Sequence, residues 1–256
     1  MSSLRLANVT RRFGGLVAVD NVSLEIPAQG ISAIIGPNGA GKTTLFNVIA
    51  GSSAPSAGRI VFAEEDITGL SPDRIAKRGL IRTFQLVQLF DNLTVLENVK
   101  VGRHLHTSGG LLTALMPYRA ARSEAAVDAA ARALLAQTGL AAQADTLAGA
   151  LPYGQKRLLE ITRALAAEPK LLLLDEPAAG LNREETGRLA TLLKQIAASG
   201  MAVLLIEHDM SLVMNVADRI TVLDFGRVIA QGTPDEVRQH RDVIAAYLGT
   251  AEASHV

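Results

Sequence analysis

The chain has 256 residues, of which 48% are hydrophobic, so it can bury a sizeable core in one large domain or in a core with a subdomain. Lys plus Arg and Asp plus Glu number 25 each, so there is no basic excess of the kind that nucleic-acid binding needs. The absence of cysteine excludes disulfides, thiolate zinc sites and thiol catalysis. The N-terminal segment lacks the apolar core of a signal peptide, and no apolar run approaches the roughly 18 residues of a membrane span.

The first part of the chain has the pattern of antiparallel strands. Apolar residues alternate weakly over residues 4–27, and Gly14 with Gly15 marks a turn between two strands. Gly58 to Phe62 has the character of a further strand of the same sheet. We therefore expect an N-terminal antiparallel β subdomain.

A glycine-rich loop stands between a short apolar strand and a helix. The strand is Ile31 to Ile35, and the helix-compatible apolar residues begin at Leu45. Between them lies the pattern G-x-x-x-x-G-K-T, followed by a second threonine. The residues of the loop are Gly36, Pro37, Asn38, Gly39, Ala40, Gly41, Lys42, Thr43 and Thr44. Glycines let backbone N–H groups turn around a phosphate, the lysine reaches the β- and γ-phosphates, and the Thr43 hydroxyl can bind Mg²⁺. The alternative is a plain turn, but both flanks and the Lys-Thr pair favour a nucleotide-binding loop.

The middle of the chain is predicted to be helical. Ser71 before Pro72 predicts a helix start, and Thr94 to Glu97 has the pattern of a capping box. The alanine-rich run Arg119 to Gln137 has one apolar face, and Gly139 is expected to end that helix. Nothing in residues 92–150 has the pattern of a strand, so we expect a helical subdomain inserted into an α/β core.

Strands and helices alternate again in the last part of the chain. A helix is expected over Gln155 to Ala167, and short apolar strands over Leu171 to Leu174 and Val203 to Ile206. Such strands, alternating with helices, predict an α/β fold: a P-loop NTPase core with a mostly parallel sheet flanked by helices. Thr233 with Pro234 predicts another capped helix. The tail beyond Gly249 is expected to be disordered.

Two adjacent carboxylates follow the strand LLLL. At the end of a parallel strand Asp175 would face the phosphate site and hold Mg²⁺, and Glu176 would polarise an attacking water. The alternative is a solvated acidic turn, which the nearby phosphate loop disfavours.

Isolated polar residues are weaker candidates for the site. Gln85 could touch Mg²⁺ or the water, or could be an ordinary polar loop residue. His208 lies just past a strand, where it could reach a γ-phosphate, although a lone histidine is more often structural. His104 and His106 lack carboxylate or cysteine neighbours, so we interpret them as surface residues and not as metal ligands.

The order of these motifs carries a family resemblance. The phosphate loop, Gln85, the helical insert, the turn LPYGQ, LLLLDE and His208 together resemble the ATP-binding subunits of ABC transporters, over nearly the whole chain. The resemblance implies one ABC ATP-binding domain over residues 1–249. Its parts would be an ATPase core at 1–91 and 151–249, a helical signature subdomain at 92–150, and a tail at 250–256.

The family's site residues carry over position by position. The resemblance implies ATP and Mg²⁺ as ligands, with Thr43, Gln85 and Asp175 near the metal and Glu176 as the catalytic base. Gln85 and His208 would assist catalysis, and Phe13 would stack on adenine, although it could be an ordinary strand residue. In the family two subunits pair head to tail, and each ATP lies between the phosphate loop of one and the signature of the other. Here the signature contacts would come from Tyr153, Gly154 and Gln155.

Two positions depart from the family pattern. Pro152 stands where the family has a serine, and it offers neither a hydroxyl nor an N–H to the γ-phosphate. Asn182 replaces the usual aspartate of the loop that crosses between subunits, which puts inter-site signalling through that loop in question.

A subgroup of the family shares further motifs with this chain. RTFQ, LFDNLTVLENV, LPYGQ and DEPAAGLN resemble the importers of branched-chain amino acids. This implies a subunit on the cytoplasmic face of the cell membrane that works with a second ATPase subunit, two membrane permeases and, indirectly, an extracytoplasmic solute-binding protein. The apolar segment Leu86 to Leu93 would receive a permease helix, or would pack inside the insert.

Two other functions remain open at this level. One is a soluble ABC-type ATPase that acts as a conformational clamp in cofactor assembly. The other is an ABC ATPase for another solute, through urea or amide import or lipid export. The sequence leaves open whether the chain pairs with itself or with a related subunit.

Overall fold

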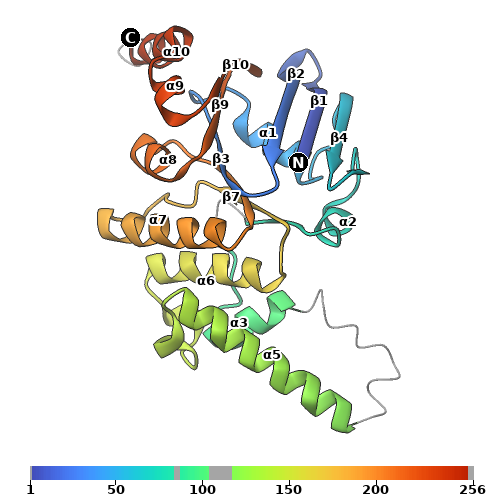
Figure 1. Cartoon of the computed structure of the whole chain (residues 1–256), viewed down its shortest axis with the longest axis vertical. Helices are drawn as coiled ribbons and strands as arrows, with labels where there is room; N and C mark the ends of the chain where they lie inside the picture. The colour runs from blue at the N-terminus through green and yellow to red at the C-terminus, as the bar shows by residue number, and fades with distance from the viewer. Residues whose placement is uncertain (1, 84–86, 104–116, 253–256) are drawn as a thin grey trace. The chain divides into compact units, whose positions relative to one another are not determined.

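A computed structural model describes residues 2–83, 87–103 and 117–252 of the chain (Figure 1). It divides into two compact units. We name the first, Met1–Arg82, Lys170–Ala179 and Thr186–Val256, the core unit. We name the second, Thr83–Pro169 and Gly180–Glu185, the helical unit.

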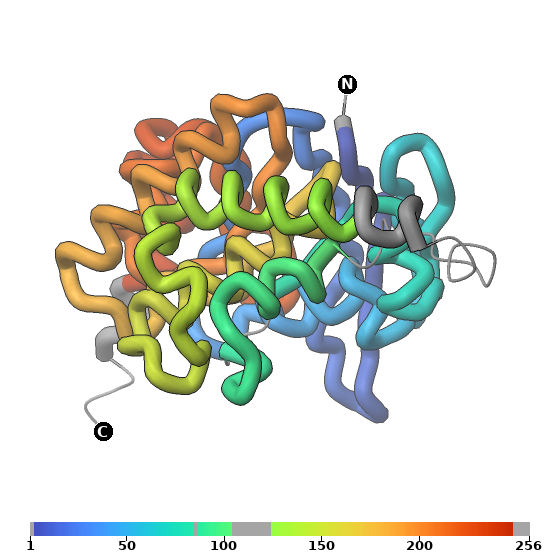
Figure 2. The backbone as a smooth tube through the Cα atoms, turned by 90° about the horizontal axis from the view of Figure 1, so that it is seen from below, coloured from blue at the N-terminus to red at the C-terminus, as the bar shows by residue number. Residues whose placement is uncertain are grey.

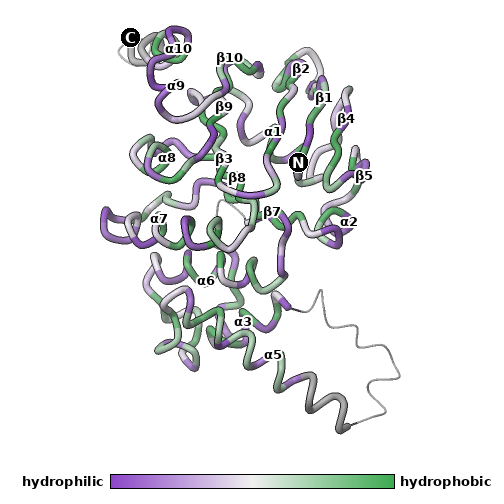
Figure 3. Tube along the Cα trace, viewed as in Figure 1, coloured by the Kyte–Doolittle hydropathy of each residue, from purple (hydrophilic) through white to green (hydrophobic). Residues whose placement is uncertain are grey.

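A six-stranded, mostly parallel sheet organises the core unit. Its strand order is β10-β9-β3-β8-β7-β6, and only the β9–β10 pair is antiparallel. The strands are β3 (Gly30–Ile35), β6 (Leu80–Arg82), β7 (Leu171–Asp175), β8 (Ala202–Ile206), β9 (Arg219–Asp224) and β10 (Arg227–Gly232). Every residue of β7 and β8 is buried, and Figure 3 shows hydrophobic positions recurring along the sheet. This burial is expected of parallel strands, whose faces are both covered.

A second, antiparallel sheet forms the N-terminal part of the core unit. Its order is β2-β1-β4-β5, with strands β1 (Ser2–Phe13), β2 (Leu16–Pro27), β4 (Ala57–Phe62) and β5 (Glu65–Asp66). Leu4, Leu6 and Val9 of β1 are buried and pack with residues of α1 (Lys42–Ile49). The predicted strands over residues 4–27 and Gly58 to Phe62 are therefore confirmed.

Two of the remaining helices of the core unit, α2 (Pro72–Ala76) and α9 (Pro234–Arg238), begin at predicted caps. The others, apart from α1, are most of α7 (Arg183–Ala198), α8 (Met210–Val216) and α10 (Arg241–Glu252). Thr233 and Glu236 form a complete capping box at the start of α9. Because α10 continues to Glu252, the prediction of disorder directly after Gly249 is wrong for residues 250–252.

In the described residues of the helical unit there are three main helices and two single turns. These are α3 (Val95–Gly102), α5 (Pro117–Gln137), α6 (Tyr153–Ala166) and the 3-10 turns η2 (Ala141–Gln143) and η3 (Ala148–Ala150). Helices α3, α5 and α6 contact one another (Figure 2). Val95, Val99, Leu135 and Leu159 are completely buried among them. The predicted insert 92–150 lies in this unit, which also takes in α6 and the signature turn.

Sequence patterns predicted most of these elements but not all. The capping box at Thr94 and Glu97 is present, and the helix over Arg119 to Gln137 is α5. The edge strand β6 and the hairpin β9–β10 were not predicted. Among the described residues, no helix is long and apolar enough to cross a membrane.

Two glycines give a test of helix packing in this fold. A Cβ on Gly102, the last residue of α3, would overlap the carbonyl oxygen of Arg163 in α6, whereas a Cβ on Gly187 in α7 meets nothing within 4 Å. We predict that Gly102→Ala lowers the free energy of unfolding by about 1–3 kcal/mol because the helices must separate. Gly187→Ala should raise it by about 0.5–1 kcal/mol through helix propensity. Urea denaturation measures both, and an unchanged stability for Gly102→Ala would contradict the close α3–α6 contact.

Candidate nucleotide-binding and hydrolysis site

The glycine-rich loop connects β3 to α1 in the core unit. Gly36 and Gly41 have φ of +151° and +97°, a region that side-chain-bearing residues avoid. A Cβ on Gly36 would overlap the carbonyl oxygen of Leu223, and one on Gly41 would overlap that of Ala18. Both positions therefore require glycine for conformation and for space.

The side chain of Lys42 is hydrogen-bonded to the backbone of its own loop. Its side chain is 7% exposed, and Nζ donates hydrogen bonds to the carbonyl oxygens of Gly36 (2.7 Å) and Pro37 (2.9 Å). Burial lowers the pKa of Lys42, and the nearby charge of Glu176 opposes that shift. The ammonium is thus held by two neutral acceptors inside the loop that the motif assigns to phosphates.

The two predicted carboxylates lie at the carboxyl end of β7. Asp175 pairs in register with Ile206 of β8, and the N–H of Glu176 donates to the Ile206 carbonyl (3.0 Å), one residue beyond the strand. Glu176 has φ +45°, which is uncommon for a residue other than glycine. The chain therefore turns at Glu176 itself, where an unusual backbone conformation is a mark of functional sites.

Arg82 is a contact of this site that sequence reasoning did not assign. Its guanidinium donates to Asp175 Oδ2 (2.7 Å) and to Asn47 Oδ1 (2.7 Å), which links β6, β7 and α1. The two side chains of the ion pair are 12% and 2% exposed. The carboxylate of Asp175 is thereby oriented in a nearly water-free position.

Glu207 is a second residue that the sequence analysis missed. It is completely buried and accepts hydrogen bonds from the backbone N–H groups of Ala178 (2.7 Å), His208 (3.1 Å) and Asp209 (3.4 Å). Burial raises the pKa of Glu207, and these N–H donors partly offset the shift. Glu207 thus connects the end of β8 to the segment after Glu176. The signal available in the sequence was a carboxylate directly after an apolar strand.

His208 lies close to both glutamates. Its Nδ1 is 3.9 Å from Glu176 Oε2 and 3.9 Å from Glu207 Oε2, and 63% of its side chain is exposed. The next residue, Asp209, caps α8 by accepting from the N–H groups of Ser211 and Leu212. The cap fixes the backbone beside His208, so the imidazole projects from a defined position at the strand end.

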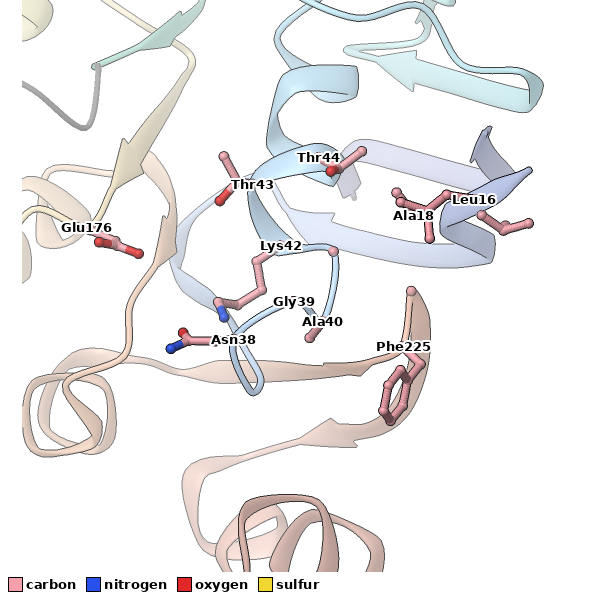
Figure 4. A pocket seen from close by; sticks show the side chains of 13 residues that line it. Leu16, Ala18, Asn38, Gly39, Ala40, Lys42, Thr43, Thr44, Glu176 and Phe225 are labelled. Carbon is pink, nitrogen blue, oxygen red and sulfur yellow. The ribbon is translucent and has the colours of Figure 1, made fainter. Parts of the chain in front are cut away.

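An open pocket of about 400 Å³ lies over the loop (Figure 4). Figure 4 shows Glu176 on one side of Lys42 and Leu16 with Phe225 on the other. The lining residues are Leu16, Val17, Ala18, Asn38, Gly39, Ala40, Gly41, Lys42, Thr43, Thr44, Glu176, Phe225 and Gly226. All of them belong to the core unit. The pocket thus brings the predicted phosphate ligands together with the predicted base.

Other predicted residues lie elsewhere. Phe13, at the end of β1, is 48% exposed, and the guanidinium carbon of Arg11 lies 4.4 Å from its ring centroid. It is not among the residues that line the pocket, so its adenine-stacking role remains a prediction. Gln85, His104 and His106 lie outside the described residues.

The turn LPYGQ opens helix α6 in the helical unit. Pro152 is the N-cap, and Tyr153 is 45% exposed with its ring beside Gly180. Gly154 is buried, and a Cβ there would overlap the carboxylate of Glu185. The turn therefore packs on the segment that precedes α7 and on the first turn of α7.

Asn182 has a local role in that segment. Its side-chain oxygen accepts from the N–H of Glu185 (3.0 Å), and its own N–H donates to the Glu185 carboxylate (3.0 Å). This reciprocal pair has the form of a capping box at the start of α7. Asparagine caps a helix as well as aspartate does, so the substitution keeps the local structure.

The fold and the pocket define a protein class. A strand, a phosphate loop and a helix in this order, with acidic residues at the end of a neighbouring parallel strand, characterise the P-loop nucleotide-binding proteins. The Mg²⁺ ligands and the nucleotide contacts of individual residues remain predictions.

Comparison with known proteins defines the family. A model of the ABC transporter family matches residues 19–179, and a model described as branched-chain amino acid ATP-binding cassette transporter matches residues 227–253. The chain is 46% identical over 252 residues to the high-affinity branched-chain amino acid transport ATP-binding protein LivG of Escherichia coli K12, covering 97% of this chain and 98% of that protein. It is 44% identical over 250 residues to BraF of Pseudomonas aeruginosa, with the same coverage.

Solved structures agree with this assignment. The ADP conformation of MJ1267, an ATP-binding cassette of an ABC transporter, is 33% identical with a TM-score of 0.84, covering 97% of this chain and 99% of that chain. A dimeric, post-hydrolysis structure of the cassette MJ0796 with ADP and Pi is 27% identical with a TM-score of 0.76, covering 90% and 98%. The chain belongs to the ABC transporter family of ATP-binding proteins, and it is an ATPase of that family.

The Arg82–Asp175 pair allows a test of the geometry of the site. We predict that Arg82→Ala lowers the free energy of unfolding by about 3–5 kcal/mol, because it removes the charge partner of a buried carboxylate. Arg5→Ala is the matched control, since the Arg5–Glu25 pair (3.0 Å) is exposed and should contribute at most about 1 kcal/mol. Chemical denaturation compares the two variants. Equal, small losses would mean that Arg82 does not hold Asp175 in solution.

Proposed function

We propose that this chain is the ATP-hydrolysing subunit of an importer of branched-chain amino acids that works through separate membrane permeases. The observation that carries the proposal is the pocket that is lined by both Lys42 of the phosphate loop and Glu176 at the strand end. The solute class is inferred from the names of relatives that are 44–46% identical over nearly the whole chain. On this proposal the protein is peripheral on the cytoplasmic face of the membrane.

ATP binding would replace the carbonyl acceptors of the Lys42 ammonium with phosphate oxygens. In the structure Lys42 Nζ is bound to the carbonyl oxygens of Gly36 and Pro37. The β- and γ-phosphate oxygens are charged and therefore stronger acceptors for the ammonium. The N–H groups at the start of α1 would add further donors to the phosphates.

The site residues fit a Mg²⁺ ion that arrives with the nucleotide. Among the described residues, no group of three or more His, Cys, Asp or Glu could hold a metal by itself. Mg²⁺ usually binds through one or two protein oxygens, water and substrate phosphates. The Thr43 hydroxyl and the Asp175 carboxylate are suitable oxygens, and Gln85 remains a predicted third contact. Bound there, the ion would neutralise charge on the phosphates.

Hydrolysis is assigned to Glu176. Its carboxylate lines the pocket and would accept a proton from the water that attacks the γ-phosphorus, while ADP leaves with the β–γ bridging oxygen. His208, at 3.9 Å from that carboxylate, would contact the γ-phosphate. Glu207 would keep both in place through its hydrogen bonds to Ala178 and His208.

Two substitutions separate binding from chemistry. Lys42→Ala should abolish hydrolysis and weaken ATP binding, because it removes the cation that faces the phosphates. Glu176→Gln should abolish hydrolysis with ATP binding retained, because the amide keeps the shape of the side chain but cannot act as a base. Phosphate release and equilibrium binding of a fluorescent ATP analogue measure the two effects. Hydrolysis by the Glu176→Gln protein near the unaltered rate would contradict the assignment of the base.

A second subunit would complete each site. On the proposal, two ATPase subunits pair head to tail, and Tyr153, Gly154 and Gln155 of one subunit contact the ATP held by the other. The dimeric MJ0796 structure supports the pairing of two such subunits, although the head-to-tail arrangement here is part of the proposal. The exposed Tyr153 lies at the surface of the helical unit, where a second subunit could reach it, whereas Gly154 is buried beside Glu185.

The loop before α3 is the proposed contact with the permeases. Phe90 is 50% exposed, and the guanidinium carbon of Arg163 lies 5.7 Å from its ring centroid. The completely buried side chain of Asn98 anchors the backbone of this loop. Its amide nitrogen donates to the carbonyl oxygens of Phe90 (3.1 Å) and Thr94 (3.0 Å), and its amide oxygen accepts from the Phe90 N–H (3.0 Å). Leu89, by contrast, is partly buried against the core of the helical unit. A loop anchored in this way, with one exposed aromatic side chain, offers an anchor for an apolar helix.

Neighbouring substitutions test the docking proposal. Phe90→Glu should leave folding and isolated ATPase activity unchanged but abolish co-purification with the permeases and ATP-driven leucine uptake into reconstituted vesicles. Leu89→Glu should destabilise the helical unit by about 2 kcal/mol or more, because it places a charge against that core. Thermal unfolding, ATPase rate and uptake are measured for both. Normal assembly and uptake with Phe90→Glu would exclude this loop as the docking surface.

A further inference from the structure

The last helix of the core unit, α10, carries a tyrosine that contacts the phosphate loop. Tyr247 is partly buried, and the backbone of Gly36 forms a hydrogen bond with its side chain. Burial raises the pKa of Tyr247, whereas this hydrogen bond lowers it. A hydrogen bond that lowers the pKa of a phenol is donated to its oxygen, so the Gly36 N–H is the donor. The contact joins two residues that lie far apart in the sequence.

Helix α10 is packed on the core unit at the turn that precedes this contact. Val243, four residues before Tyr247, is buried, and α10 contacts both β10 and α9. Residues four apart share one face of a helix, so Val243 and Tyr247 lie on the packed face. Ile244, by contrast, is exposed. The hydroxyl therefore reaches the loop from an anchored helix.

The bond adds to a set of contacts around Gly36. The carbonyl oxygen of Gly36 accepts from Lys42 Nζ (2.7 Å), and a Cβ on Gly36 would overlap the carbonyl oxygen of Leu223. Tyr247 adds a contact at the N–H. On the proposed function, ATP draws Lys42 away from the Gly36 carbonyl. The Tyr247 hydroxyl and the Leu223 carbonyl then stay in place on the first residue of the loop.

A packing role is the alternative for Tyr247, because a tyrosine hydroxyl that is partly buried usually has some hydrogen-bond partner. Two observations favour a role at the loop. The partner is a residue with φ +151°, where the backbone conformation itself requires glycine. The tyrosine also belongs to residues 227–253, which match the model of the branched-chain amino acid cassettes, whereas the general family model ends at residue 179.

We propose that Tyr247 is a positioning residue for the phosphate loop. Its hydroxyl holds the Gly36 peptide in the phosphate-binding conformation while Lys42 changes acceptors, and it touches no phosphate itself. The C-terminal helix thereby contributes to nucleotide affinity. This inference rests on the proposed nucleotide binding at Lys42, so its first test is made without any nucleotide.

The contact is tested by NMR on the nucleotide-free chain. Ile35–Gly36 is the only Ile-Gly pair in the sequence, so carbonyl-¹³C isoleucine combined with ¹⁵N glycine selects the Gly36 amide alone. In the unaltered protein this amide should be protected from exchange with solvent. Tyr247→Phe removes only the hydroxyl and should move the Gly36 amide proton upfield, because that proton loses its acceptor. Ile244→Ala, on the exposed face of the same helix, is the matched control and should leave the resonance unmoved.

The role is tested by equilibrium binding of ATP and of inorganic tripolyphosphate, which has the phosphates but no base. Tyr247→Phe should raise both Kd values by the same factor, roughly two- to tenfold, the equivalent of one hydrogen bond. In hydrolysis the KM for ATP should rise by that factor with kcat retained, because Glu176 is untouched. Ile244→Ala should change none of these values. A residue that served packing alone would alter thermal unfolding but neither Kd.

Three results would overturn the inference. Rapid exchange of the Gly36 amide in the unaltered protein, or an unmoved resonance in Tyr247→Phe, would mean that the bond is absent in solution. A moved resonance with both Kd values unchanged would limit Tyr247 to packing. An equal rise of both Kd values in Ile244→Ala would assign the effect to the helix as a whole. If Lys42→Ala altered the binding of neither ligand, the proposed function itself would fail, which is a distinct outcome.

Discussion

The parallel pairing of β3, β8 and β7 is the constraint on which the site depends. Ala33 and Ile34 of β3 pair with Leu205 and Ile206 of β8, and Ile206 pairs in turn with Asp175 of β7. Because parallel strands in register end at one edge of the sheet, the residues that follow each strand meet there. The phosphate loop, Glu176 and Glu207 with His208 are these residues. Their convergence follows from the backbone hydrogen bonding between the strands.

Three charged groups at that edge have hydrogen-bond partners within the protein. Lys42 donates to two carbonyl oxygens, Asp175 accepts from Arg82, and Glu207 accepts from three backbone N–H groups. A buried charge without such partners would cost several kcal/mol. These contacts hold the side chains in position, and on the proposed function a nucleotide would displace only the neutral carbonyl acceptors of Lys42. A site organised in advance loses little free energy to reordering when its ligand binds.

The parts of the site that sequence predicted are those encoded by local patterns. The phosphate loop, Asp175 and Glu176 each follow an apolar strand within a few residues, and the capping boxes at Thr94 and Thr233 lie within one helical turn. Arg82 was missed because its contact depends on a residue far along the chain. It donates to Asp175, which is 93 positions away. No periodicity within β6 indicates that partner.

The central claim is that Lys42 exchanges the loop's own carbonyls for the phosphates of ATP. The most direct measurement is a crystal structure of the unaltered chain with Mg²⁺ and a non-hydrolysable ATP analogue. The account predicts Lys42 Nζ about 3 Å from β- and γ-phosphate oxygens, detached from the carbonyls of Gly36 and Pro37, with the carboxylate of Glu176 facing the γ-phosphate. A triphosphate bound away from residues 36–44, or one bound there while Lys42 still donates to both carbonyls, would contradict it.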